Sequence, residues 1–136
     1  MRKYLILAAV AALLPSLTEA RDDRLQTLAG TRWQLQVEPG EKSQARGEKS
    51  FAETVIFEGN EVSMLESGKR GFAPSAYKEV KDGGKINFVI DQTSATEGKM
   101  HWECDVREGW FKGVLIWTRA DGKERNFLFR GQQAKP

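Results

Sequence analysis

Short runs of alternating apolar and polar residues, each closed by a turn, set narrow limits on the fold of this chain. Residues 31–38 show the pattern, because Trp33, Leu35 and Val37 are separated by polar residues. Successive side chains of a strand point to opposite faces, so such a run predicts a strand with one buried face. Beyond Gly30 no stretch carries a comparable helical periodicity. The sequence therefore predicts an all-β domain.

Eight short β-rich runs follow one another, most of them separated by only a few residues. They cover residues 31–38, 51–58, 61–66, 72–80, 85–91, 99–107, 110–119 and 124–130. The turns Asp82-Gly83-Gly84 and Asp121-Gly122 are typical of tight hairpins. Consecutive hairpins build an antiparallel up-and-down meander, and a meander of this size removes its exposed edges by closing on itself. The expected fold is an eight-stranded antiparallel up-and-down barrel.

Two places modify this expectation. Pro74 lies inside the run 72–80 and lacks the backbone N–H that a ladder requires, so we expect an edge or a bulge there. Before the first run, Asp22 or Asp23 can cap a short helical turn that ends at Gly30.

Large aromatic side chains occupy the face expected to point inward. The inward candidates include Trp33, Phe57, Phe88, Trp102, Trp117 and Phe127. A barrel of eight strands either fills its interior with side chains or holds one small ligand, and the sequence leaves both open. If a ligand enters, we expect it to contact Trp33, Phe88, Trp102 and Trp117.

The N-terminus has the features of a secretory signal peptide. Met1-Arg2-Lys3 precedes an apolar run from Tyr4 to Leu14, and small residues occupy Thr18 and Ala20. This pattern predicts cleavage after Ala20, a signal peptide over residues 1–20 and a mature domain over 21–136. The run is too short to span a bilayer, and no later segment is long and apolar. We expect an extracytoplasmic protein, periplasmic or secreted, with no membrane span after cleavage.

Charge and cysteine content narrow the class of partner. Without the leader, basic and acidic residues are nearly equal in number. Nucleic-acid binders usually carry a strong basic excess, so we expect no nucleic-acid partner. Cys104 is the only cysteine and cannot form an internal disulfide. We expect it to be a small buried hydrophobe.

Several stretches resemble a known group of proteins. The segment Leu28-Ala29-Gly30-Thr31-Arg32-Trp33 resembles the opening leucine, glycine, threonine and tryptophan stretch of lipocalin-like (calycin) barrels. Residues 55–62, 77–78, 85–88 and 122–125 are similar to a secreted bacterial lipocalin-like family that is abundant in planctomycetes and has no assigned function. The resemblance implies a short helical turn before the first strand and a tryptophan that closes one barrel end. It implies no catalytic or ligand residues.

The strongest candidate for a chemical site is a group of three residues that share one face of a strand, His101, Glu103 and Asp105. An imidazole and two carboxylates can bind zinc. Alternate residues on a strand, however, lie about 6.5–7 Å apart, and the opposite face is apolar, so we interpret this face as solvated. A serine-type catalytic triad would have to use the single histidine, and the sequence has no Gly-x-Ser-x-Gly motif to supply its serine. We therefore expect no enzyme activity, no catalytic residues, no metal site and no cofactor.

The last hairpin carries positive charge and aromatic residues. These charges can bind an anion or protect the neighbouring apolar strands from aggregation; they lie at Arg119, Lys123, Arg125 and Arg130. Trp110 falls on the outward parity, where it would join an exposed contact patch. A bulge at Lys112-Gly113 would instead reverse that parity.

Two functions fit these features. The first is a non-enzymatic binding barrel for a small apolar or amphipathic ligand. The alternative is a protein-interaction module, an inhibitor or envelope scaffold, with a filled interior. Its partner would contact the Trp110 region and the polar loop 39–50.

Overall fold

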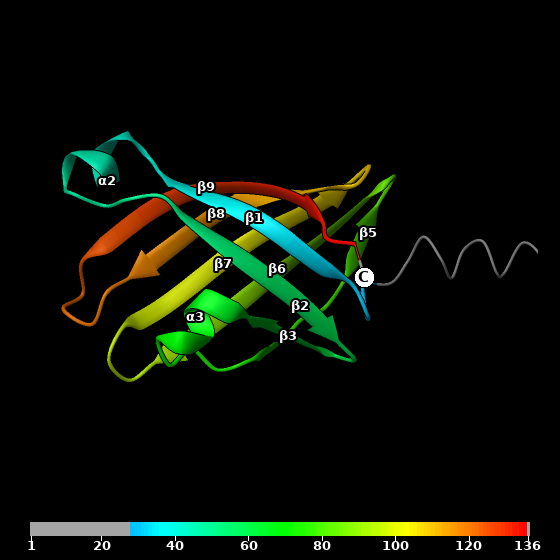
Figure 1. Cartoon of the computed structure of the whole chain (residues 1–136), viewed down its shortest axis with the longest axis horizontal. Helices are drawn as coiled ribbons and strands as arrows, with labels where there is room; N and C mark the ends of the chain where they lie inside the picture. The colour runs from blue at the N-terminus through cyan, green and yellow to red at the C-terminus, as the bar shows by residue number, and fades with distance from the viewer. Residues whose placement is uncertain (1–27, 136) are drawn as a thin grey trace, which may run out of the picture.

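The computed structural model describes residues 28–135, which form one antiparallel sheet with short helical segments at its margins (Figure 1). The predicted signal peptide and most of the predicted helical turn lie outside the described residues. The elements in chain order are β1 (Arg32–Pro39), α2 (Glu41–Ala45), β2 (Phe51–Glu58), β3 (Glu61–Met64), α3 (Leu65–Lys69), β4 (Ser75–Ala76), β5 (Val80–Asp82), β6 (Lys85–Ser94), β7 (Gly98–Arg107), β8 (Trp110–Thr118) and β9 (Glu124–Gln133).

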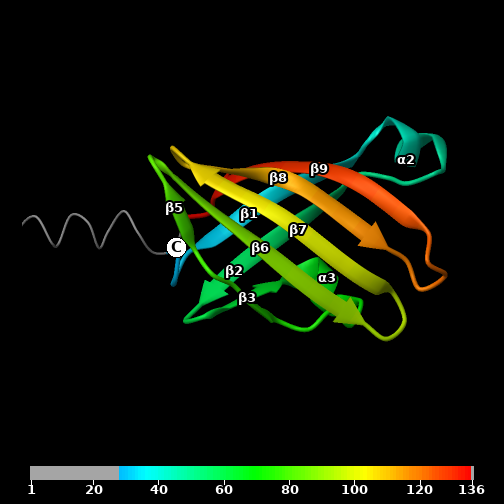
Figure 2. The ribbon, with the colours of Figure 1, turned by 180° about the vertical axis from the view of Figure 1, so that it is seen from behind.

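The sheet curls into a half-barrel, visible from both sides in Figures 1 and 2. Its strand order is β4-β3-β2-β1-β9-β8-β7-β6-β5. The long strands at the two ends of the chain, β1 and β9, pair in register, with Val37 opposite Phe129. The all-β antiparallel prediction is therefore confirmed. The predicted closed barrel of eight strands is not confirmed, because the sheet of the described residues has nine strands and two edges, β4 and β5, which are not paired with each other.

The fourth predicted strand, residues 72–80, is where the sheet is interrupted. Only β4 and the first residue of β5 fall within it, and these strands pair with different neighbours, β3 and β6. Pro74 precedes β4 and lacks an N–H. The ring of Tyr77 lies between the two edges and contacts Phe57 and Phe88 at centroid distances of 5.0 and 5.8 Å. Between β4 and β5, side-chain packing therefore takes the place of backbone hydrogen bonds.

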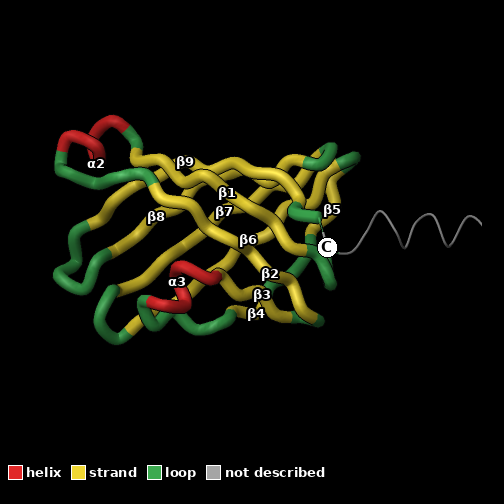
Figure 3. Tube along the Cα trace, in the orientation of Figure 1, coloured by secondary structure: helices red, strands yellow, loops and turns green. Residues whose placement is uncertain are grey.

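Helices α2 and α3 are the parts of the fold that the sequence pattern missed (Figure 3). The predicted strand 61–66 ends at Met64, and α3 begins at the next residue, Leu65. The carboxylate of Glu53, on the inner face of β2, accepts hydrogen bonds from the backbone N–H groups of Glu66 and Ser67 at 2.8 and 2.9 Å. These N–H groups belong to the first turn of α3 and have no partner within the helix.

The inner face of the sheet is a packed aromatic core. All six aromatic residues predicted to point inward are buried, and so is Cys104, as predicted. The ring of Phe111 contacts those of Trp33 and Phe88 at centroid distances of 5.6 and 5.5 Å. Trp102 contacts Phe129 at 5.3 Å. Each of these contacts joins strands that lie two apart in the sheet, whereas Phe57 of β2 reaches across the half-barrel to Phe88 of β6 at a centroid distance of 5.6 Å.

The register of β8 is continuous through the Lys112-Gly113 pair, so no bulge reverses its parity. Trp110 therefore points outward and is 41% exposed. At Gly113, an added Cβ would collide with the backbone carbonyl of Glu103 on β7. Glycine here lets neighbouring strands approach closely on the inner face.

Candidate functional site

One end of the half-barrel is hollow, and we call this hollow the mouth. It lies where β1 begins and the hairpins β5–β6 and β7–β8 turn, at the end marked C in Figure 1. Its volume is about 630 Å³, within the range of small-molecule pockets. It is bordered by the turn glycines Gly83, Gly84 and Gly109, which carry no side chain to fill the space.

The floor of the mouth is apolar because inward positions at the ends of three strands meet there. Trp33 of β1, Ile86 of β6 and Val106 of β7 line it, and Leu28 closes it beside the start of β1. Ile86 and Val106 face each other in the β6–β7 register. Trp33 donates its indole N–H to Thr31 Oγ1 at 2.9 Å, so the polar atom of this side chain is already satisfied.

The rim of the mouth is basic. Lys81, Lys85 and Arg107 line it together with a single acid, Glu108. Lys85 and Arg107 are directly opposite each other in the β6–β7 register. Within residues 28–135, none of these three cations pairs with a carboxylate. An apolar floor under a rim with three cations and one acid is suited to an amphipathic anion.

The structure distributes the four predicted ligand residues over different places. Trp33 lines the mouth, and Phe88 lines a groove beside β5. Trp117 lines a smaller cleft of about 210 Å³ near α3, at the opposite end. Trp102 is completely buried. Only Trp33 among them belongs to the mouth.

Trp117 is covered by cations and is held in place at that opposite end. The guanidinium carbon of Arg119 lies 3.6 Å from the centroid of the Trp117 ring, and that of Arg70 lies 5.3 Å away. Arg119 also pairs with Glu48, as does Arg125 at 3.5 Å. The positive charge predicted around the last hairpin is thus partly neutralised by an acid from the segment between α2 and β2.

Sequence reasoning missed the basic rim. Lys81, Lys85 and Arg107 lie on three different strands next to turns, a position typical of solvated charge. The strand register that brings them together cannot be read from their spacing along the chain. Part of the apolar floor could be predicted from the sequence, because the alternation in residues 31–38 already indicated that Trp33 points inward.

The face of β7 that carries His101, Glu103 and Asp105 points outward. His101 Nδ1 lies 2.6 Å from Asp91 Oδ1 on β6, and Nε2 lies 3.4 Å from Glu103 Oε2. Both ring nitrogens therefore face carboxylates, and Asp105 is not in this group. Among the described residues, no cluster of three or more histidine, cysteine or acidic side chains is placed to hold a metal ion.

We predict that His101 titrates above its ordinary pKa of 6.5. The hydrogen bond to Asp91 raises the pKa, partial burial opposes this, and the charges of Asp91 and Glu103 raise it further. Because the folded-state pKa is the higher one, this stabilisation is complete below about pH 6.5 and is lost as the pH rises through the folded-state pKa. An NMR titration of the single histidine measures the effect.

The variant Asp91→Asn should lower the pKa of His101 towards 6.5, whereas Glu66→Gln, on α3, should leave it unchanged. A wild-type pKa at or below 6.5 would contradict the hydrogen bond to Asp91.

Comparison with known proteins does not extend this description. No family model, curated protein or solved structure matches the chain. The resemblance to the secreted lipocalin-like family stays a prediction. In the described part of the chain, no helix has the length and apolar character needed to cross a bilayer.

Proposed function

We propose that this protein is a non-enzymatic, extracytoplasmic binding domain that holds a small amphipathic anion in the mouth. The apolar part of the ligand would lie on Trp33, Ile86 and Val106, and its anionic group would face Lys81 and Lys85. The observation that carries the proposal is the combination of an apolar floor and unpaired cations around about 630 Å³ of space.

Packing in the interior favours an amphipathic ligand over a wholly apolar one. Directly behind Trp33, the ring of Phe111 contacts both Trp33 and Phe88. A ligand at the mouth would therefore bind near the end of the half-barrel and keep one end close to solvent. Apolar contact supplies affinity in proportion to the area removed from water, and the rim supplies preference for negative charge.

Decanoate and 1-decanol, which share a chain length and differ in charge, test this proposal. The mature domain is titrated with each by calorimetry and by tryptophan fluorescence. We expect decanoate to bind more tightly than decanol and to weaken as salt is added. In the double variant Lys81→Gln/Lys85→Gln, decanoate should bind about tenfold more weakly, a loss of about 1.4 kcal/mol, while decanol binding stays the same.

Lys123→Gln is the matched control, because Lys123 is an exposed lysine in the β8–β9 turn, near the opposite end. This variant should bind decanoate as the wild type does. Equal binding of decanoate by the wild type and the double variant would refute the role of the rim, and failure of both probes to bind would refute the site.

The alternative, a protein-interaction module that uses the outside of the half-barrel, needs a contiguous apolar surface. Val114 and Leu128 are exposed and opposite each other on β8 and β9. The cationic pair Lys112 and Arg130 lies between them and Trp110. Because this charged pair divides the apolar residues, the outer face supports a protein partner less well than the mouth supports a small ligand.

A further inference from the structure

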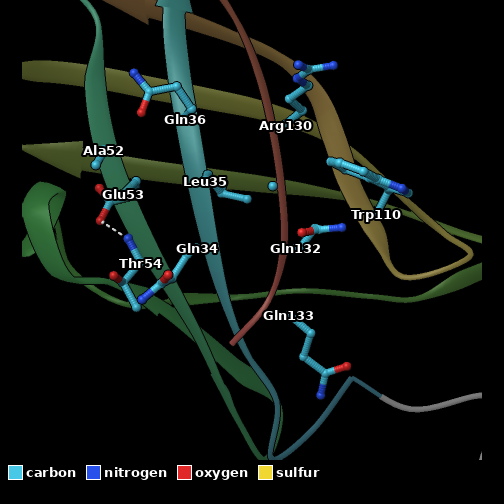
Figure 4. Close-up of a pocket in the computed structure, with 11 residues that line it drawn as sticks. Gln34, Leu35, Gln36, Ala52, Glu53, Thr54, Trp110, Arg130, Gln132 and Gln133 are labelled. Atoms are coloured by element: carbon cyan, nitrogen blue, oxygen red, sulfur yellow. Dashed lines mark hydrogen bonds between the residues drawn. The ribbon is translucent and has the colours of Figure 1, made fainter. Parts of the chain in front are cut away.

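The outer face of the sheet carries a row of side chains that the proposed ligand site does not use. Thr54 of β2, Gln34 of β1, Gln132 of β9 and Trp110 of β8 are consecutive partners across four neighbouring strands. We call these four residues the outer row. Figure 4 shows them along a shallow depression of about 610 Å³, with Gln36 and Arg130 beside them.

The outer row is rich in amide groups. A glutamine side chain offers two N–H donors and a carbonyl acceptor. Within the described residues, the amides of Gln34, Gln36 and Gln132 have no hydrogen-bond partner in the protein. They are exposed, so a ligand can bond to them without breaking an internal contact. A ligand that fits must present both donors and acceptors at close spacing.

Trp110 ends the outer row with an exposed aromatic surface. Its side chain is 41% exposed, and the guanidinium carbon of Arg130 lies 6.0 Å from its ring centroid, at the outer limit of a cation–π contact. The ring is therefore not closely covered. A tryptophan in such a position combines apolar contact with a polar N–H at its edge.

From this arrangement we infer that the outer row is a binding platform for a carbohydrate chain. A pyranose ring has an apolar C–H face that can stack on Trp110, and hydroxyl groups that donate to and accept from glutamine amides. Neighbouring strands are about 4.8 Å apart, which is comparable with the length of one sugar ring. Successive sugar units can thus meet successive strands.

Two other ligand classes fit this face less well. A protein interface has an apolar centre, whereas the cross-strand partners of Trp110 are the polar residues Gln132 and Arg107. Lys112 and Arg130 separate Trp110 from Val114 and Leu128. A nucleic acid requires a dense array of cations, whereas the outer row itself is uncharged.

The test uses three soluble probes, cellohexaose, chitohexaose and hexagalacturonate, with the mature domain. Binding is measured by calorimetry and by NMR shifts of the tryptophan indole and glutamine amide signals. We expect at least one probe to bind, with shifts at Trp110, Gln34 and Gln132. Trp110→Ala should weaken binding about tenfold or more, and Trp110→Phe should retain part of the affinity.

Leu128→Ser is the matched control, because Leu128 is an apolar residue on the same face and is 61% exposed. It should bind the probe as the wild type does. The variant Lys81→Gln/Lys85→Gln should also bind normally, which separates this platform from the mouth. No binding of any probe, or equal binding by the wild type and Trp110→Ala, overturns the inference. Loss of binding in Leu128→Ser also overturns the inference, because Val114 and Leu128 would then form the contact surface.

Discussion

Replacing Trp102 with alanine is expected to lower the free energy of unfolding by about 3–5 kcal/mol. The side chain is completely buried, its ring contacts Phe129 at 5.3 Å, and its N–H donates to Gln92 Oε1 at 3.1 Å. Alanine would leave a large cavity and remove the donor to a buried amide, and both effects destabilise the fold. Urea denaturation followed by circular dichroism measures the loss.

Trp110→Ala makes the same chemical change on the other side of the sheet, and serves as the control. Because Trp110 is 41% exposed, we expect a loss below about 1 kcal/mol. The two variants together test the direction in which each strand faces. Equal destabilisation by both would contradict the assignment of inner and outer faces. If Trp102→Ala kept its stability and lost ligand binding, Trp102 would line a ligand cavity instead of the core.

Replacing Glu53 with alanine is expected to cost about 3 kcal/mol. This carboxylate is 2% exposed and accepts hydrogen bonds from the backbone N–H groups of Thr54, Glu66 and Ser67 and from the Ser67 hydroxyl. It connects the inner face of β2 to the first turn of α3. Alanine would leave these buried donors unpaired, and hydrogen bonds to a charged acceptor are the stronger kind.

Thermal and urea unfolding of Glu53→Ala, Glu53→Gln and Glu58→Ala form a graded series. Glu58 is exposed at the end of the same strand, so its replacement should change stability by less than about 0.5 kcal/mol. Glu53→Gln keeps the shape and one acceptor oxygen, so we expect an intermediate loss. If Glu53→Ala and Glu58→Ala were equally stable, the bonds to α3 would contribute nothing to folding.

The sequence was most informative where local signals agreed with one another. Residues 51–58 were predicted as a strand with the bounds that β2 has, because a β-rich run ends there at the turn Gly59-Asn60. The inward direction of Trp33 and Trp102 followed from the period-two alternation in their own runs. Glu53, by contrast, occupies an inward position where the pattern calls for an apolar residue, and only its bonds to α3, 13 and 14 residues away, account for it.

Features that depend on contacts between distant parts of the chain could not be predicted. The interruption in residues 72–80 was suggested by Pro74, but the packing of Tyr77 against Phe57 and Phe88 involves two other strands. The mouth depends on the register of β5, β6 and β7, and the outer row on that of four strands. Spacing along the chain specifies neither of these arrangements.

The two free edges of the half-barrel bear on how this protein avoids self-association. A bare strand edge offers unpaired N–H and C=O groups to any other chain, and long flat edges promote fibril growth. Here the edges are β4, only two residues long, and β5, only three. The segment that contains both edge strands is charged, because it carries Lys78, Glu79 and Lys81. Edges so short and so charged are poor templates, so the sheet can remain open without seeding aggregates.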